Sequence, residues 1–441
     1  MNFQSEIHSQ TVAPFNIIAK PIGPICNIDC TYCFYLEKEN LFPDKNDFRM
    51  SPDVLESYIR QKIESHQTPQ VAFAWQGGEP TLLGVDFFRK VVELQQKYAN
   101  GKKIDNAFQT NGILLNDEWC GFFSEHNFLI GLSIDGPREI HDKYRVDKGG
   151  KPTFDKVMLG IDFLKKHKVE FNTLTVLQRD NANHPLEVYN FLKEVGSGFM
   201  QFIPIVERIA EDPVDDGLSL ALPGHEGAKV SEWSVEPEQF GKFMVAIFDA
   251  WVRRDVGHVY VQIFDVALEA WYGMEPGLCV FSKKCGRALA IEHNGDLYSC
   301  DHYVYPENKL GNIMEIPISS LIESQQQKTF GSDKWDKLPR FCHECEVRFI
   351  CNGECPKNRF LTTPDGESGL NYLCAGYKFF FKHIDLYMQF MASELRNRRA
   401  PANVMAWAKD KDNGFPSFNL DRNALCLCGS GKKFKVCCRK S

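Results

Sequence analysis

Cysteine spacing constrains this chain more than any other feature of its sequence, because sixteen cysteines fall into three tight groups and one single position. The groups are Cys26, Cys30 and Cys33; Cys279, Cys285, Cys300, Cys342, Cys345, Cys351, Cys355 and Cys374; and Cys426, Cys428, Cys437 and Cys438. Cys120 is left over. The N-terminus lacks the basic start and apolar core of a signal peptide, so we expect a cytoplasmic protein. Because cytosolic thiols stay reduced, the groups indicate metal or cluster ligands rather than disulfides.

Composition argues against two broad classes of partner. The 441 residues carry a formal net charge of −7, whereas a general nucleic-acid binder has a basic surplus. No apolar run approaches the roughly 18 residues that a membrane span needs. We therefore expect neither a nucleic acid nor a membrane as a partner. Apolar residues make up 43% of the chain and charged residues 25%, which predicts a packed core.

Strand-like and helix-like segments alternate over the first 205 residues. Short apolar runs predict strands at Phe15–Ala19, Val71–Trp75, Ala107–Thr110, Phe128–Ile134, Phe171–Leu177 and Phe199–Ile205. Helical period is found between most of them, at Pro52–Glu64, Val85–Tyr98, Asp117–His126, Phe154–Lys166 and Leu186–Val195. This alternation predicts an α/β fold in which six units form an open, partial (β/α)6 TIM-like barrel. Active-site residues should then lie at the C-terminal ends of the strands.

Four domains or segments are expected along the chain. The barrel occupies residues 1–235, and residues 206–236 are polar and rich in Gly and Pro, which predicts a loop or linker. A cysteine-rich metal-binding domain covers residues 236–385, and we expect the stretch from about 275 to 380 to be loop held by metal. A helix and linker follow at 386–421, and a small cysteine tail at 422–441. Helical pattern returns at Pro237–Arg254, Ile263–Tyr272 and Tyr377–Arg399.

Cys26, Cys30 and Cys33 supply three thiolates from one short loop. A 4Fe–4S cluster has four irons, so three thiolates leave one iron open to a cofactor or substrate. The alternative is a zinc ion with a distant fourth ligand. A second motif, Gly77-Gly78-Glu79-Pro80, follows the second predicted strand. Its two glycines permit close backbone approach to a ligand, and its carboxylate could meet an ammonium group.

Together these motifs resemble the radical S-adenosylmethionine superfamily over about residues 15–205, with Tyr32 and Phe34 at its usual aromatic positions. The resemblance implies that the methionine amine and carboxylate of S-adenosylmethionine chelate the open iron. The reduced cluster then cleaves the sulfonium to give a 5′-deoxyadenosyl radical. By the same resemblance, residues 77–80 bind the methionine amine.

Further cofactor contacts follow from the resemblance. Tyr35 would meet the adenine, and Gln76 and Ser133, at strand ends, would make additional contacts. The loops Thr110–Gly112 and Ser133–Pro137 also match strand-end loops of the family, although Asn-Gly and Asp-Gly-Pro are ordinary turns in their own right. His141 and Arg145 would either face the ligands or belong to a solvated helix face.

The eight central cysteines are enough for two fully ligated 4Fe–4S clusters or for two structural zinc ions, and spacing alone leaves both open. Their pattern resembles the SPASM extension of peptide- and protein-modifying radical enzymes. With Cys279 the full set resembles the anaerobic sulfatase-maturating enzymes over most of residues 1–385. That resemblance implies two interleaved clusters, one on Cys279, Cys285, Cys300 and Cys355, the other on Cys342, Cys345, Cys351 and Cys374.

Asp301 directly follows Cys300, and a carboxylate beside a cluster could act as a general base. Its position relative to the cysteine resembles that of the catalytic aspartate of the maturase family. The alternative is a turn residue or a simple hydrogen-bond acceptor. His302 and Tyr303 are weaker candidates.

The last cysteines, Cys426, Cys428, Cys437 and Cys438, place four soft ligands within thirteen residues, which suits one tetrahedral zinc ion. So short a segment cannot bury a core, so Zn²⁺ would supply its folding energy. It resembles the SEC-C motif, and both a structural role and a docking role stay open.

The resemblance implies an enzyme that oxidises a cysteine or serine of a sulfatase to Cα-formylglycine without oxygen. Its cofactors would be S-adenosylmethionine, three 4Fe–4S clusters and Zn²⁺ in the tail. Its partners would be an unfolded or nascent sulfatase polypeptide and an electron donor such as flavodoxin or ferredoxin. Two alternatives remain: a SPASM-type maturase that forms a thioether or carbon–carbon crosslink in another peptide, and a non-catalytic zinc scaffold.

Overall fold

A ten-stranded sheet is the centre of the fold in a computed structural model of the chain, which describes residues 13–42, 48–210, 218–223, 225 and 227–414. Six of its strands are parallel neighbours and follow the predicted order. They are β1 (Asn16–Lys20), β3 (Gln70–Trp75), β4 (Lys103–Thr110), β5 (Leu129–Ser133), β7 (Phe171–Leu177) and β8 (Phe199–Pro204). The predicted partial (β/α)6 barrel is therefore confirmed.

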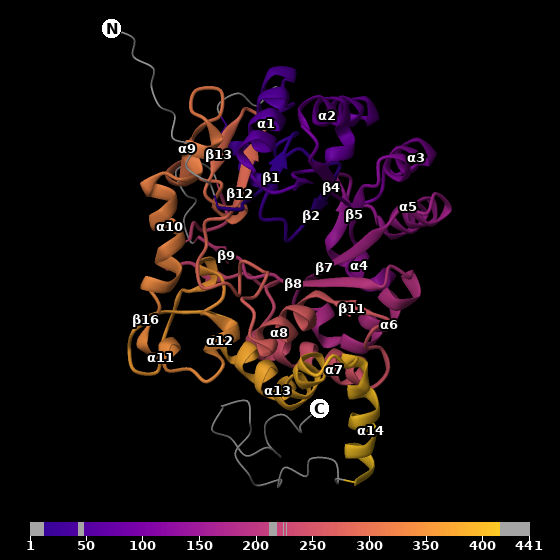
Figure 1. Cartoon of the computed structure of the whole chain (residues 1–441), viewed down its shortest axis with the longest axis vertical. Helices are drawn as coiled ribbons and strands as arrows, with labels where there is room; N and C mark the ends of the chain where they lie inside the picture. The colour runs from indigo at the N-terminus through magenta and orange to yellow at the C-terminus, as the bar shows by residue number, and fades with distance from the viewer. Residues whose placement is uncertain (1–12, 43–47, 211–217, 224, 226, 415–441) are drawn as a thin grey trace.

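The barrel helices lie along the outer side of this arc of strands (Figure 1). They are α1 (Pro52–Ser65), α2 (Val85–Tyr98), α3 (Asp117–Glu125), α4 (Arg138–Tyr144), α5 (Phe154–Lys166) and α6 (Pro185–Val195). Local signals set their ends: the Ser51 hydroxyl accepts from Val54 N at the start of α1, and left-handed Gly196 follows α6.

Aromatic side chains fill the space between the sheet and the outer helices. The Phe88 ring of α2 meets Trp75 of β3 edge-on at 5.7 Å and Phe108 of β4 at 4.9 Å, measured between ring centroids. All three side chains are fully buried. Truncating any of them to alanine would cost about 3–5 kcal/mol, so this layer fixes the strands whose ends form the site.

The sheet continues beyond the barrel on both sides. Strand β11 (Tyr260–Val261) pairs in parallel with β8, and β12 (Ala288–Glu292) pairs in parallel with β1, matching Asn16 to Ala288 and Lys20 to Glu292. Antiparallel β13 (Asp296–Tyr298) and β14 (Lys309–Asn312) complete it.

The expectation that residues 275–380 are loop is therefore wrong in part. Besides β12–β14, this region contains α9 (Ile318–Ile322), α10 (Gln325–Asp336), α11 (Arg340–His343) and α12 (Arg348–Cys351). Strand β12 contains only four consecutive apolar residues, and its hydrogen-bonding partner lies far back in the sequence. Local periodicity cannot reveal such a pairing.

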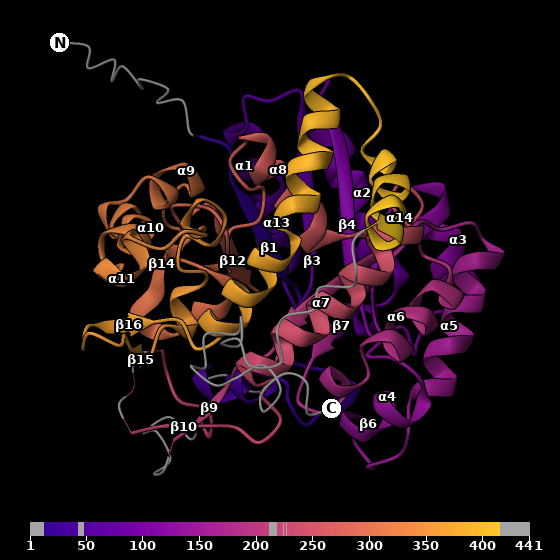
Figure 2. The ribbon, with the colours of Figure 1, turned by 90° about the horizontal axis from the view of Figure 1, so that it is seen from below.

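A second helical layer covers the C-terminal side of the molecule. It consists of α7 (Pro237–Arg254), α8 (Gln262–Tyr272), α13 (Cys374–Arg396) and α14 (Val404–Gly414). Figure 2 shows α13 and α14 running past α7, with the cysteine-rich segments to one side. Three short antiparallel pairs complete the described structure: β2 (Ile28–Cys30) with β6 (Arg145–Asp147), β9 (Arg208–Ile209) with β10 (Lys229–Val230), and β15 (Leu361–Thr362) with β16 (Ser368–Leu370). Among the residues that the structure describes, no helix is long and apolar enough to cross a membrane.

Candidate active site

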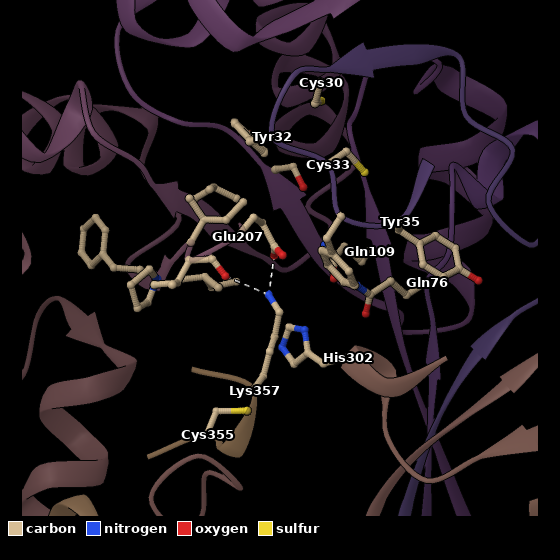
Figure 3. Close-up of a pocket in the computed structure, with 18 of the residues that line it drawn as sticks. Cys30, Tyr32, Cys33, Tyr35, Gln76, Gln109, Glu207, His302, Cys355 and Lys357 are labelled. Atoms are coloured by element: carbon tan, nitrogen blue, oxygen red, sulfur yellow. Dashed lines mark hydrogen bonds and ion pairs between the residues drawn. The ribbon is translucent and has the colours of Figure 1, made fainter. Parts of the chain in front are cut away.

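A cavity of about 300 Å³ opens at the C-terminal ends of the barrel strands (Figure 3). Each parallel strand contributes a residue at or next to its end: Lys20, Gln76, Thr110, Ser133, Val176 and Pro204. The opposite wall comes from the cysteine-rich region and includes His302, Cys355 and Lys357. This is the edge at which a (β/α) barrel is expected to hold its active site.

The three N-terminal cysteines all line this cavity. Their loop follows β1 and is fixed by the β2–β6 pair, which sets Cys30 opposite Arg145. Burial raises the pKa of the Cys33 thiol, while the backbone N–H groups of Tyr35 and Leu36 oppose the shift. N–H groups that face sulfur are the environment that a cluster thiolate needs, because they stabilise its negative charge.

The Gly77-Gly78 turn packs against the segment that precedes the cysteines. Gly78 N donates to Gly23 O at 2.7 Å, and Glu79 N donates to Ile25 O at 2.8 Å. A Cβ on Gly78 would lie 1.8 Å from the Ile25 carbonyl oxygen, so no other residue fits there. Both glycines also line the cavity. The motif therefore joins the strand end to the cysteine loop.

Glu79 and Pro80 do not line the cavity. The buried Glu79 carboxylate accepts from Thr81 N at 3.0 Å, the Thr81 hydroxyl at 2.7 Å, the Thr110 hydroxyl at 2.8 Å and Asn111 N at 2.8 Å. With these partners the carboxylate ties the loops after β3 and β4 together. Gly77 and Gly78 line the cavity, and the Glu79 carboxylate lies close enough for its charge to raise the pKa of Cys26.

Replacing Gly78 with alanine is expected to lower the free energy of unfolding by about 1–3 kcal/mol, because the loop must move away from the new methyl group. Binding of S-adenosylmethionine should weaken as well. Anaerobic thermal unfolding measures the first effect and equilibrium dialysis the second. Gly121→Ala is the matched control, because Gly121 lies in α3 and a Cβ added there would meet no other part of the protein within 4 Å. The control should be about 0.5–1 kcal/mol more stable than the wild type. Equal melting temperatures for Gly78→Ala and the wild type would contradict the packing argument.

The other predicted cofactor residues are placed as follows. Gln76, Ser133 and Tyr35 line the cavity, and the buried Tyr35 hydroxyl donates to Glu292 at the end of β12. Arg145 also lines it, ion-paired at 3.1 Å with the buried Asp135. His141 lies neither on a solvated face nor in the cavity: it is buried and bonds Thr153 through Nε2 at 3.1 Å.

Asp301 lies just behind the cavity wall, joined to it by an ion pair. Its carboxylate is 2.6 Å from the Lys20 amine, which lines the cavity and lies 3.8 Å above the centre of the Tyr35 ring. Burial raises the pKa of Asp301, but the charges of Lys20 and His302 outweigh it and leave the pKa below its ordinary value. The side chain is therefore a carboxylate at neutral pH, the form that a general base needs.

Several residues of the site were not singled out from the sequence. Lys20, Glu292, Glu207 and Lys357 are all buried or nearly so, and the Lys357 amine pairs with the Glu207 carboxylate across the cavity (Figure 3). The sequence contained a signal for Lys20, because a charged residue directly ends an apolar strand. It contained no such signal for Glu207, which lies in the stretch that we interpreted as loop.

Residues 21–192 match the Radical SAM superfamily, residues 279–346 the iron–sulfur cluster-binding domain called SPASM, and residues 422–440 the SEC-C motif. A serine-type anaerobic sulfatase-maturating enzyme of Bacteroides thetaiotaomicron is 51% identical over 397 residues, covering 90% of this chain and 96% of that enzyme. The chain belongs to the anaerobic sulfatase-maturating enzyme family. A cysteine-type member from Clostridium perfringens is 35% identical, over 84% of this chain and 96% of the relative.

Solved structures agree with this membership. Native anSMEcpe with bound AdoMet and the Cp18Cys peptide superposes with a TM-score of 0.76 at 33% identity, over 87% of this chain and 100% of that one. Streptococcus suis SuiB bound to S-adenosylmethionine has a TM-score of 0.54 at 14% identity and shares the fold. The predicted family and fold are thus confirmed, as is the prediction that the cofactors include S-adenosylmethionine and iron–sulfur clusters.

The cavity of this maturase-family chain fits such a cofactor. Three thiols converge on one side, and the buried Nδ1 of His302 has no hydrogen-bond partner in the described part of the chain. An orphaned polar atom in a cavity wall is expected where a polar ligand completes the site.

The eight central cysteines form two sets in space. Cys342, Cys345, Cys351 and Cys374 all line one small cavity between α11, α12 and the start of α13. The other set consists of Cys279, Cys285, Cys300 and Cys355. Its members lie close together, because the charge of Cys279 raises the pKa of each of the other three thiols. Over the described ranges no group of three His, Cys, Asp or Glu side chains is arranged to hold a single metal ion. The tail cysteines Cys426–Cys438 lie outside the described residues.

Proposed function

We propose that the chain oxidises a cysteine or serine side chain of a sulfatase polypeptide to Cα-formylglycine in the absence of oxygen. One observation supports this most directly. The cavity has Cys30 and Cys33 at one end and Cys355 at the other (Figure 3). A peptide side chain held between them would be close both to the site of radical formation and to an electron acceptor. Full-length similarity to a peptide-bound relative supports the same substrate class.

The oxidation requires two electrons and two protons to leave the substrate side chain. When bound, the cofactors supply a 5′-deoxyadenosyl radical that takes a hydrogen atom from Cβ, and an acceptor for the remaining electron. Asp301 would take the proton from the substrate thiol or hydroxyl, since the cavity-lining Lys20 holds it as a carboxylate just behind the wall. An aldehyde forms from serine, and a thioaldehyde that hydrolyses to the same product forms from cysteine.

The cofactor set belongs to the same proposal. The cavity cysteines would hold one 4Fe–4S cluster with an open iron, and the two spatial sets of four would hold two fully ligated clusters. Cys426, Cys428, Cys437 and Cys438 would hold Zn²⁺. A small one-electron carrier such as flavodoxin or ferredoxin would supply the electron that starts each turnover.

A paired peptide assay tests the function. Peptides with a sulfatase modification sequence, carrying Ser, Cys or Ala at the target position, are incubated anaerobically with S-adenosylmethionine and a reductant. The Ser peptide is expected to give an aldehyde that a hydrazide reagent traps, and the 51% identity to a serine-type enzyme supports this choice. The Ala peptide, which lacks an ionisable proton, should stay unmodified.

Mass spectrometry separates the outcomes. Unchanged Ser and Cys peptides alongside rapid cofactor cleavage would reject sulfatase peptides as substrates. A product without a carbonyl group but with an internal crosslink would favour the other SPASM-type chemistry.

A further inference from the structure

A buried lysine stands beside the first set of central cysteines. Lys334 of α10 is 1% exposed, and its amine donates to Cys279 O at 2.6 Å and to Val280 O at 2.8 Å. No carboxylate oxygen of the described residues lies within the 4.0 Å of an ion pair with this amine. Burying an ammonium group without a nearby counter-charge is costly, so its location calls for a negative partner.

The negative groups around Lys334 are the Glu354 carboxylate, whose pKa the charge of Lys334 lowers, and the cysteine thiolates. The positive charge of Lys334 lowers the pKa of Cys279 and Cys285, each against a larger rise from burial. In return, the thiolates of Cys285 and Cys355 raise the pKa of Lys334, which burial lowers. A cluster on these cysteines would add negative charge beside the Lys334 amine.

Two other buried charged groups lie nearby. The Arg359 guanidinium donates to the carbonyl oxygens of Gly353 at 2.8 Å and Lys334 at 2.6 Å. Its charge lowers the pKa of Cys285, and the Cys355 thiolate raises the pKa of Arg359. Glu354 is buried too, and its carboxylate accepts from Asn371 at 2.6 Å. Both cations are held by backbone carbonyl oxygens, and in Lys334 a glutamine can replace the charge while it keeps a donor for Cys279 O and Val280 O.

We propose that Lys334 is a positioning residue that raises the reduction potential of the cluster on Cys279, Cys285, Cys300 and Cys355. This inference rests on the proposed function, because it assumes that these four thiolates hold a 4Fe–4S cluster. A cluster held by these cysteines would serve as the acceptor for the second substrate electron, and its charge would then be one unit more negative. A fixed positive charge beside it stabilises the reduced form more than the oxidised one. Lys334 would thereby favour removal of the second electron from the substrate.

The test is an EPR-monitored redox titration of the holoenzyme carrying Lys334→Gln, which removes the charge and keeps a donor. At a fixed potential, the ratio of reduced to oxidised cluster should fall at least tenfold. For a one-electron couple this corresponds to a reduction potential that is lower by about 59 mV. The other two clusters should keep their potentials. Lys337→Gln is the matched control, because Lys337 follows α10, is 73% exposed and pairs with Asp333. It should cause no comparable shift.

Several outcomes overturn the proposal. An unchanged potential with full iron content does so, and so does an equal shift in all three clusters. If Lys334→Gln loses iron, Lys334→Met, which fills the same buried volume without charge, takes its place. Loss of the cluster in both variants would show a structural role instead. Wild-type protein with fewer than ~12 irons, the number that three cubanes contain, would refute the cluster assignment of the proposed function before any variant is made.

Discussion

Replacing Cys33 with alanine is expected to abolish both reductive cleavage of S-adenosylmethionine and formation of the aldehyde. Cys33 is one of three cysteines in the cavity, and the backbone N–H groups of Tyr35 and Leu36 favour the thiolate of its half-buried side chain. Two thiolates do not retain a cubane in a cavity open to ligands. Iron content should fall from about twelve to about eight per chain, and both activities should drop to background. Iron and sulfide analysis, with chromatography of 5′-deoxyadenosine, measures these effects.

Cys120→Ala is the control for this variant. Cys120 is buried in α3 among aromatic core residues and lies apart from the cavity. It should lose a small amount of stability, about 1–2 kcal/mol for the deleted sulfur, and keep all of its iron. Cofactor cleavage that survives in Cys33→Ala would mean that the open-iron cluster is held elsewhere.

Replacing Asp301 with asparagine is expected to reduce product formation by about 10²–10⁴-fold while S-adenosylmethionine is still cleaved. Asparagine has nearly the same shape but cannot accept the substrate proton. In the wild type the Lys20 amine lies 2.6 Å from the Asp301 carboxylate, and in the variant it would have no negatively charged partner there. The measurement is the ratio of aldehyde to 5′-deoxyadenosine in one reaction, together with iron content, which should stay at the wild-type level.

A second lysine-paired aspartate separates a catalytic effect from a structural one. Asp255 is mostly buried and pairs with Lys193 at 2.7 Å, and neither residue lines the cavity. Asp255→Asn should lower the melting temperature and leave the product ratio unchanged. A normal ratio in Asp301→Asn would remove the proposed base from the mechanism.

The sequence predicted the barrel well because its determinants are local. Helices α2 and α5 have the predicted bounds, since amphipathic period and terminal residues are carried within each segment. The cysteine triplet was likewise evident, because its three ligands come from eight consecutive residues. Strand β12 was missed because its meaning depends on a partner in another part of the chain.

The parts of the site that escaped prediction have the same origin. The Tyr35–Glu292 contact joins residues 257 positions apart, and Lys357–Glu207 joins residues 150 apart. Neither residue of the second pair belongs to a motif, and their proximity follows from the barrel and the cysteine-rich region facing each other. Glu79 shows the converse case: the motif was visible, but the hydrogen bonds that fix its carboxylate depend on the next strand.

The parallel pairing of β1 with β12 also determines how late the sheet can be completed during translation. About 270 residues separate the two strands, so a ribosome working at roughly 5–20 residues per second needs about 15 to 50 seconds between them. During that interval β1 has a bare hydrogen-bonding edge, and the loop with Cys26, Cys30 and Cys33 has no covering wall from residues 292–305. Enclosure of these three cysteines is therefore a late event, which waits until β12 has been synthesised and has paired with β1.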